Sequence, residues 1–263
     1  MHAGRRVAVV VPALDEEASI GDVVQGFRAL ASVDLVVVVD NRSRDRTAER
    51  AREAGAVVVA ENRPGYGAAL RAGIEHALER GAGIVVLAEA DGTFDPADLA
   101  RLLAELGESE LVLGSRTAEM RGALRLGNRA VARLLAALWP RSSCALTDVG
   151  CTYRAFRARP GAALRAGASA DGPEFSPRMI CEAFRRGLAV REVPVRYGAR
   201  SSGESKHTGS ACAAARPAAR MLRVRSSRDG WPRAEQRSAV AGVARAVTVP
   251  FQYPYGSRVK TRR

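Results

Sequence analysis

Cysteine is scarce in this chain, and long apolar runs are absent. Only four cysteines occur among 263 residues, with no CxxC spacing and no histidine–cysteine cluster: Cys144, Cys151, Cys181 and Cys212. We therefore expect neither a disulfide framework nor a zinc site, and we interpret these thiols as small buried groups in a reducing compartment. No window approaches the roughly 18 uninterrupted apolar residues that a membrane-spanning helix requires.

Export signals are also lacking. The chain reaches its first predicted strand at Val7, too soon for a signal peptide. The apolar segment 239–251 is interrupted by Arg245 and ended by Pro250, so it could at most lie on a membrane surface. These features predict a soluble, cytoplasmic protein.

Positive charge is concentrated near the C-terminus. The formal net charge is +13, and residues 211–263 carry twelve Arg or Lys against Asp229 and Glu235, a balance of +10. A basic segment of this kind suits a polyanion, such as an anionic membrane or a phosphorylated acceptor, better than sequence-specific recognition of nucleic acid. We therefore expect no nucleic-acid partner. Peripheral contact with the inner face of the membrane is one interpretation of residues 211–263, and a solvated, partly disordered tail is the other.

The first 115 residues predict an α/β fold. Short β-branched runs alternate with amphipathic segments, which is typical of a mostly parallel sheet covered by helices. The predicted strands are Val7–Val11, Leu35–Val39, Val57–Ala60, Ile84–Ala88 and Leu111–Gly114. The predicted helices are one with Ile20, Val23, Val24, Phe27 and Leu30 on its buried face, and others at about 46–54, 66–80 and 97–106.

Residues 117–210 are less regular. They predict helices near 121–138 and 177–187 and a strand at Ala189–Val195. We expect residues 1–210 to form the catalytic domain, followed by a basic helix to about Arg225 and a loose appendage with several Gly and Pro breakers.

Polar residues follow three of the predicted strands, at the edge where open parallel sheets bind their ligands. Glu89 and Asp91 are two residues apart, so alternation would point both carboxylates to one side if the strand continued that far. Two such oxygen donors suit Mg²⁺ or Mn²⁺, which would neutralise a diphosphate. The alternative is an ordinary acidic pair at a strand end.

Two further segments could contact a nucleotide. Asp40 follows the second strand at an equivalent height, where it can accept hydrogen bonds from a base or ribose; alternatively Asp40, or more readily Ser43 or Asp45, caps the next helix. The segment Gly65-Tyr66-Gly67 lacks the third glycine and the Lys-Ser/Thr of a Walker loop. We interpret it as a tight turn that lets helix 66–80 approach the nucleotide.

These motifs together resemble a known family. In order, the segments 10–17, 38–47, 65–70 and 89–96 are similar to those of family 2 glycosyltransferases of the GT-A fold. Segments 114–116, 125–129, 148–156 and 192–206 more narrowly resemble the dolichyl- or polyprenyl-phosphate mannosyl/glucosyltransferases. The resemblance extends over about residues 7–210.

The resemblance implies roles for individual residues. It implies a donor site at Pro12, Leu14, Glu16, Asp40, Asn41, Gly67, Ala90 and Asp91, a metal at Glu89 and Asp91, acceptor-phosphate contacts at Arg116 and Arg129, and closure over the donor diphosphate by Arg200 and Lys206. Arg129 could instead pair within its helix, and Lys206 could be a solvated charge.

The sequence departs from the family at three points. Glu89 stands where an Asp is usual and is longer by one methylene, which allows a water-mediated metal contact instead of a direct one. Asn41-Arg42 replaces a common Asp-Gly pair, so base or ribose contacts could differ. The extra membrane helices of many members are absent.

The resemblance implies an inverting transfer of a hexose from a UDP- or GDP-sugar. A lipid-phosphate acceptor is already anionic and needs only cations such as Arg116 and Arg129 to hold it. A hydroxyl on a small molecule would need a base, for which Asp148 is the candidate, unless Asp148 only orients its loop. A nucleotidyltransferase should have a glycine- and lysine-rich loop after the first strand, which Pro12–Glu17 is not. A non-catalytic nucleotide-sugar binding protein is the remaining alternative.

Overall fold

A central seven-stranded sheet organises the chain. The computed structural model describes residues 1–118, 125–126, 128–130, 132–133, 135, 146–168 and 170–200. The elements are β1 (Val7–Ala13), α1 (Ile20–Arg28), β2 (Leu35–Asp40), α2 (Thr47–Glu53), β3 (Val57–Ala60), α3 (Tyr66–Glu79), β4 (Ile84–Leu87), a 3₁₀ turn (Pro96–Asp98), α4 (Leu99–Glu105), β5 (Leu111–Ser115), β6 (Arg154–Arg157), α6 (Ala158–Gly167), α7 (Phe175–Arg185) and β7 (Val190–Pro194).

The sheet is mixed but mostly parallel. Its strand order is β3-β2-β1-β4-β6-β5-β7, and β6 runs antiparallel to both of its neighbours. Arg154, the first residue of β6, therefore lies beside Leu87 of β4 and Leu113 of β5, near the carboxyl ends of both strands. The reversed strand thus begins at the edge where parallel strands end.

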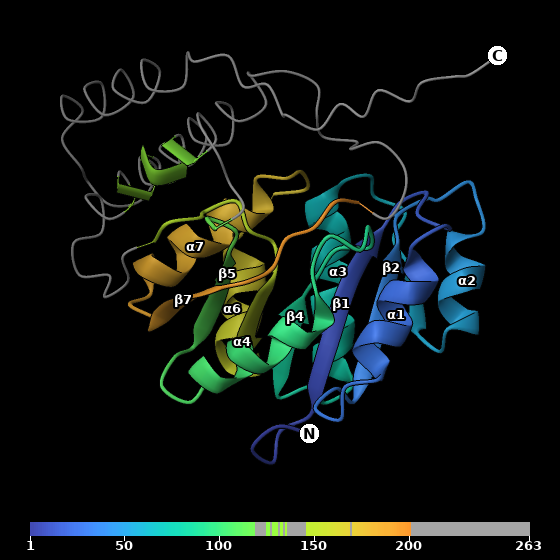
Figure 1. The fold of residues 1–263 in the computed structure, drawn as a ribbon, viewed down its shortest axis with the longest axis horizontal. Coiled ribbons are helices and arrows are strands. Elements are labelled where there is room, and N and C mark those ends of the chain that lie inside the picture. Colours follow the sequence, from blue (N-terminus) through green and yellow to red (C-terminus); the bar gives the residue numbers. More distant parts are fainter. Residues whose placement is uncertain are drawn as a thin grey trace.

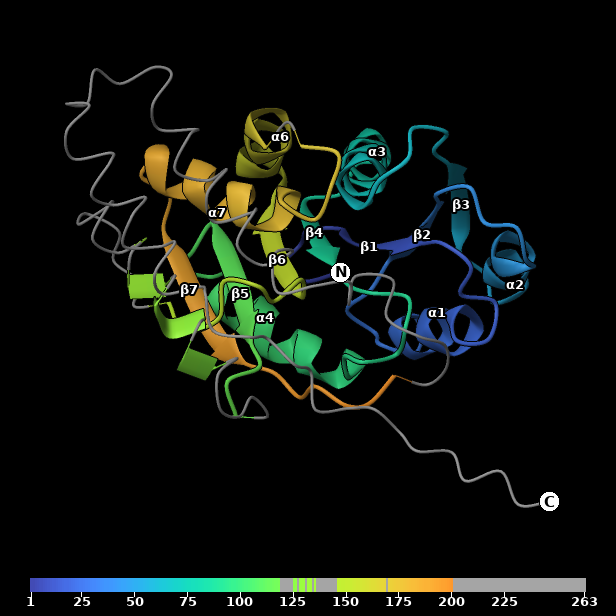
Figure 2. The ribbon, with the colours of Figure 1, turned by 90° about the horizontal axis from the view of Figure 1, so that it is seen from above.

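Helices cover both faces of the sheet, as predicted (Figures 1 and 2). Helices α3, α6 and α7 lie on one face, and α1, α2 and α4 lie on the other. The strand interiors are buried on both sides, which explains why their sequences read as continuous apolar runs. Four of the five residues of the predicted face of α1 are buried, Ile20, Val23, Val24 and Phe27; Leu30 lies beyond the end of the helix and is partly buried.

The strands and helices predicted for the first 115 residues are confirmed, but β6 and α6 were not predicted. Two arginines enclose only two apolar residues in β6, a pattern that does not look like a buried strand. The predicted helix 121–138 and everything after residue 200 lie largely or wholly outside the described residues. No helix in the described ranges is long and apolar enough to cross a bilayer.

Candidate active site

A cavity of about 190 Å³ lies at the carboxyl ends of β1, β2 and β4. Its lining consists of Pro12, Ala13, Leu14, Glu16, Asn41, Gly65, Tyr66, Ala69, Glu89, Ala90, Asp91 and Arg200. Most of the donor-site and metal-site residues expected from the sequence are thus brought together. Asp40 and Gly67 are not among the lining residues, and Lys206 lies outside the described residues.

The acidic pair reaches the cavity by a route that the sequence did not predict. Strand β4 ends at Leu87, so strand alternation does not orient Glu89 and Asp91. A turn follows instead, in which Gly92 adopts a φ of 73°. The Oδ1 atom of Asp91 accepts hydrogen bonds from the Thr93 amide at 3.1 Å and from the Thr93 hydroxyl at 2.7 Å. These bonds fix the Asp91 carboxylate.

Glu89 is held by a residue from the loop before β6. The Thr152 hydroxyl donates to Glu89 Oε1 at 2.6 Å. Burial and the neighbouring Asp91 carboxylate raise the pKa of Glu89, against the opposing effects of Thr152, Arg116 and Arg200. Two carboxylates held together away from water favour a nearby cation.

The donor set fits a divalent ion that also binds its substrate. The described residues contain no cluster of three or more His, Cys, Asp or Glu side chains that could enclose a metal. Mg²⁺ is commonly bound by one or two carboxylates and completes its coordination with substrate phosphates and water. Glu89 and Asp91 match that arrangement.

Arg200 brings a positive charge into the same cavity. Its Nη2 atom lies 3.0 Å from Asp91 Oδ2, and its Nη1 atom lies 3.9 Å from Glu16 Oε1. The guanidinium therefore links the ends of β1 and β4. Arg200 thus lies in the cavity, and its contact with the donor diphosphate stays a prediction.

Asn41 holds the loop between β3 and α3. Its side-chain amide donates to the carbonyls of Glu61 at 2.8 Å and Arg63 at 2.7 Å, and its Oδ1 accepts from the Gly65 amide at 2.9 Å. A carboxylate could not donate to the two carbonyls. The Asn at this position is therefore matched to the local backbone.

The alternative role of the residues after β2, capping of the next helix, holds to a different extent for each of them. Asp45 Oδ1 accepts from the Thr47 amide at 3.0 Å and so satisfies one amide at the start of α2, although Asp45 precedes the N-cap residue, Arg46. Ser43 does not cap this helix; its hydroxyl accepts from the Asp15 amide. Asp40 accepts from the Ser43 amide at 3.2 Å, which orders the turn after β2.

Close backbone packing explains Gly65 and Gly67. Gly65 has a φ of 125°, and a Cβ there would lie 2.3 Å from the Asp171 carbonyl oxygen. A Cβ on Gly67 would lie 2.1 Å from the Ala170 carbonyl oxygen, and the Gly67 amide donates to Asp171 at 2.7 Å. Gly67 thus ties α3 to the 170–172 loop, while Gly65 and Tyr66 face the cavity.

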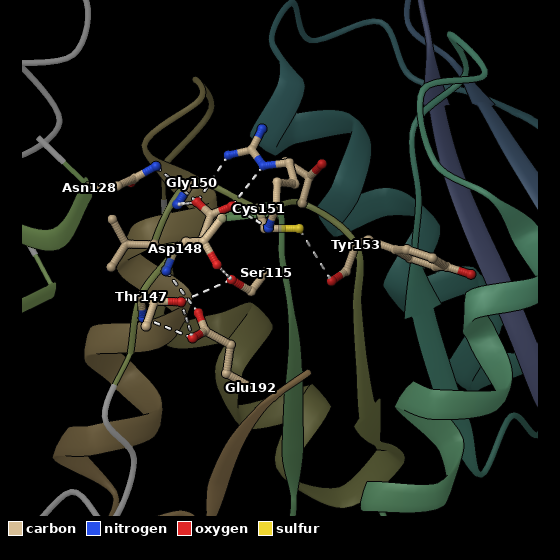
Figure 3. A network of polar contacts seen from close by, with 12 residues as sticks. Ser115, Asn128, Thr147, Asp148, Gly150, Cys151, Tyr153 and Glu192 are labelled. Carbon is tan, nitrogen blue, oxygen red and sulfur yellow. Dashed lines mark hydrogen bonds and ion pairs between the residues drawn. The ribbon is translucent and has the colours of Figure 1, made fainter. Parts of the chain in front are cut away.

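A second polar centre lies beside β5, around Asp148 (Figure 3). Asp148 is fully buried, and Arg116 Nε and Nη2 donate to its two oxygens at 2.7 and 3.0 Å. The carboxylate also accepts from the amides of Arg116 and Gly150 and from the Asn128 side chain. On its other side, the Arg116 guanidinium lies 5.1 Å from the centre of the Tyr197 ring.

Glu192 of β7 supports this centre and was missed as a site residue. Its carboxylate accepts from the Thr147 amide and hydroxyl at 2.8 and 2.6 Å, and from the Asp148 amide at 2.8 Å. Burial raises the pKa of Glu192, and these hydrogen bonds oppose the shift. Segment 192–206 was part of the family resemblance, but no role for Glu192 followed from it.

Other residues near this centre differ in their surroundings. Arg129 is exposed. Cys151 is buried, and burial raises the pKa of its thiol to about 12, so it stays protonated at neutral pH. The two cysteines within the described ranges, Cys151 and Cys181, are buried and unpaired as expected.

The sheet, the acidic pair at its edge and the adjoining basic centre define a glycosyltransferase of the GT-A fold. The family model "Glycosyl transferase family 2" matches residues 8–159. The chain belongs to this family, and it is an enzyme of the glycosyltransferase class.

Several relatives and solved structures are similar. An uncharacterized glycosyltransferase of Mycobacterium tuberculosis is 36% identical over 228 residues, covering 79% of this chain and 92% of the relative. The undecaprenyl-phosphate mannosyltransferase of Micrococcus luteus is 32% identical, covering 78% and 88%. Glucosyl-3-phosphoglycerate synthase of M. tuberculosis, solved with Mn²⁺, UDP-glucose and phosphoglyceric acid, is 28% identical with a TM-score of 0.66, covering 87% and 82%.

Proposed function

We propose that this protein transfers a hexose, with inversion, from a nucleoside diphosphate sugar to a polyprenyl phosphate. The observation that carries the proposal is the convergence of Glu89, Asp91 and Arg200 in one cavity at the strand ends. Paired carboxylates and a guanidinium are the groups required to hold a metal-bound diphosphate.

The donor side is supported by the cavity lining. Leu14 is 38% exposed at this site, which is an unusual position for a large apolar side chain and suits packing against a base or ribose. When bound, a divalent cation held by Glu89 and Asp91 would neutralise the diphosphate as it leaves. The solved synthase binds Mn²⁺ and UDP-glucose, which supports the same donor chemistry here.

The state of Asp148 favours an acceptor that needs no base. Its carboxylate is 0% exposed and accepts five hydrogen bonds, so it has little capacity left to take a proton from an acceptor. We therefore assign Asp148 a positioning role for Arg116. Arg116 and the exposed Arg129 would hold the acceptor phosphate, whose oxygen attacks the anomeric carbon opposite the leaving diphosphate.

A phosphorylated small molecule bearing a hydroxyl is the second candidate acceptor. The specific observation in its favour is the phosphoglyceric acid bound to the similar synthase. This reaction would require deprotonation of the hydroxyl. The two candidates share the phosphate contact and differ in the need for a base.

The test is a transfer assay with the full chain, Mn²⁺ and either UDP-glucose or GDP-mannose. We expect a glycolipid product with undecaprenyl phosphate and none in the variant Asp91→Asn. Transfer to 3-phosphoglycerate alone would replace the proposed acceptor by the second candidate. Absence of transfer and of nucleotide-sugar hydrolysis with every donor would contradict the proposal.

We also propose that residues 1–210 form the catalytic domain and that residues 211–263, with their net charge of +10, bring it to an anionic membrane. Each Lys or Arg near such a surface contributes about 1 kcal/mol, and the attraction falls with salt. Cosedimentation with phosphatidylglycerol vesicles should be strong at low salt and weak at high salt. Binding that is unchanged after truncation at residue 210 would refute this assignment.

A further inference from the structure

Arg154 is an arginine with no exposed surface at the beginning of the reversed strand β6. Its guanidinium donates to three main-chain carbonyls: Cys151 at 2.8 Å, Val149 at 3.3 Å, and Ser176 in α7. No ion pair joins it to a carboxylate within the part of the chain that the structure describes. Burial lowers the pKa of Arg154, which reflects the cost of placing this charge away from water.

The loop that Arg154 supports joins the two halves of the site. At one end of residues 148–152, Asp148 binds Arg116 with a hydrogen bond of 2.7 Å. At the other end, the Thr152 hydroxyl donates to Glu89 at 2.6 Å. Arg154 contacts the carbonyls of the residues between these ends, and its own backbone is fixed between β4 and β5.

We infer that Arg154 is a positioning residue whose guanidinium holds the 148–152 loop in place relative to the sheet. Through this loop, Arg154 orients Glu89 toward the donor and Arg116 toward the acceptor. The planar fork of an arginine can serve three carbonyls at once in a fixed geometry. The inference rests on the proposed function, because it concerns placement of the groups assigned to the metal-bound diphosphate and the acceptor phosphate.

The same strand provides a matched control. Arg157 lies at the opposite end of β6, beside Ile84, and among the described residues its guanidinium also donates only to carbonyls, those of Leu106 and Gly107. The variants Arg154→Met and Arg157→Met therefore remove similar contacts from the two ends of one strand. Both should lower the melting temperature, but only Arg154→Met should alter the site.

The experiment measures UDP and GDP binding in saturating Mn²⁺ by calorimetry, well below the melting temperature of each full-length variant. For the nucleotide that the wild type binds, we expect Arg154→Met to weaken affinity at least about tenfold, which corresponds to about 1.4 kcal/mol. Arg157→Met should stay within about twofold of wild type. Arg154→Lys should recover part of the loss, since an ammonium keeps the charge and has three donors.

A second variant protects the test against loss of folding. Thr152→Val removes the bond to Glu89 without touching Arg154 and should weaken binding in the same direction. If Arg154→Met does not fold, the nucleotide affinities of Arg154→Lys and Thr152→Val are compared with those of Arg157→Met and the wild type instead. Affinities of these variants equal to that of Arg157→Met would overturn the inference while leaving the donor site intact; a wild-type chain that binds neither nucleotide would contradict the proposed function itself.

Discussion

The Nη2 atom of Arg200 lies 3.0 Å from Oδ2 of Asp91, the carboxylate that we assign to the metal. The guanidinium of Arg200 therefore neutralises this oxygen. Any divalent ion that binds Asp91 Oδ2 must compete with the guanidinium. The diphosphate offers Arg200 an alternative partner, so donor and metal should bind more readily together than the metal binds alone.

The variant Arg200→Gln tests this competition. It should raise the affinity for Mn²⁺ alone by up to about fivefold, because a partly exposed ion pair contributes up to about 1 kcal/mol. It should lower the affinity for UDP in the presence of Mn²⁺, since a diphosphate contact is lost. Calorimetry measures both values. Arg196→Gln is the control, because Arg196 pairs with Asp95 and Asp98 outside the cavity lining; equal effects in both variants would argue against the competition.

Glu89→Gln should separate stability from function. The ionised carboxylate is unfavourable in the folded protein, as its raised pKa indicates, and the amide removes its repulsion with Asp91. We expect the metal-free variant to melt a few degrees higher and to bind Mn²⁺ with UDP much more weakly. Scanning calorimetry with and without Mn²⁺ measures both effects. A variant that melts lower and binds normally would contradict this account of Glu89.

Asn41→Asp should destabilise the protein although the change is nearly isosteric. The new carboxylate would face the carbonyls of Glu61 and Arg63, to which the amide now donates. Loss of these buried hydrogen bonds should cost about 2 to 3 kcal/mol of the free energy of unfolding. Protonation would restore one donor, so the loss should be smaller at pH 5 than at pH 8. Urea unfolding at the two pH values measures this difference, and an equal loss at both would disagree with it.

Asp148→Asn discriminates between a base and a positioning residue. As a positioning residue, Asp148 acts through Arg116, and the variant should raise the acceptor KM more than it lowers kcat. The double variant with Arg116→Lys should lose much less than the sum of the two single losses, since both changes break one pair. A base would instead show a large loss of kcat with additive effects. Steady-state kinetics with undecaprenyl phosphate at several pH values provides the readout.

Gly67→Ala should disturb the start of α3. The added Cβ would meet the Ala170 carbonyl oxygen at 2.1 Å, so the helix or the 170–172 loop must move. We expect a lower melting temperature and weaker nucleotide binding. Gly21→Ala in α1 is the control, because a Cβ there meets nothing within 4 Å; alanine should stabilise that helix by about 0.5 to 1 kcal/mol. Normal nucleotide affinity in Gly67→Ala would show that this packing does not shape the site.

Much of the fold could be predicted because its elements are locally encoded. The parallel strands are continuous apolar runs, and α1 repeats its apolar residues at helical spacing, so each element can be recognised from a short segment of sequence. Strand β6 could not be recognised in this way. Its arginines donate to main-chain carbonyls, and two of these carbonyls come from distant segments, at Leu106 and Ser176.

The residues of the candidate site likewise fall into a group that could be predicted from local sequence and a group that could not. Residues that follow the parallel strands, such as Glu16, Glu89 and Asp91, could be found from the sequence because strand ends mark the binding edge. Thr152, Arg154 and Glu192 lie in segments that carried the resemblance, but their roles could not be predicted, because these depend on how the reversed strand and β7 are placed in the sheet. The orientation of Glu89 and Asp91 was also beyond the strand pattern, since a turn sets it.

The antiparallel course of β6 has a wider consequence. The chain leaves the sheet at Ser115 and re-enters it at Arg154, and both points lie on the rim that carries the donor cavity. The residues between these two points therefore begin and end at the same edge of the sheet. A change in the number of residues between these two points therefore does not by itself shift the register of β5 against β6.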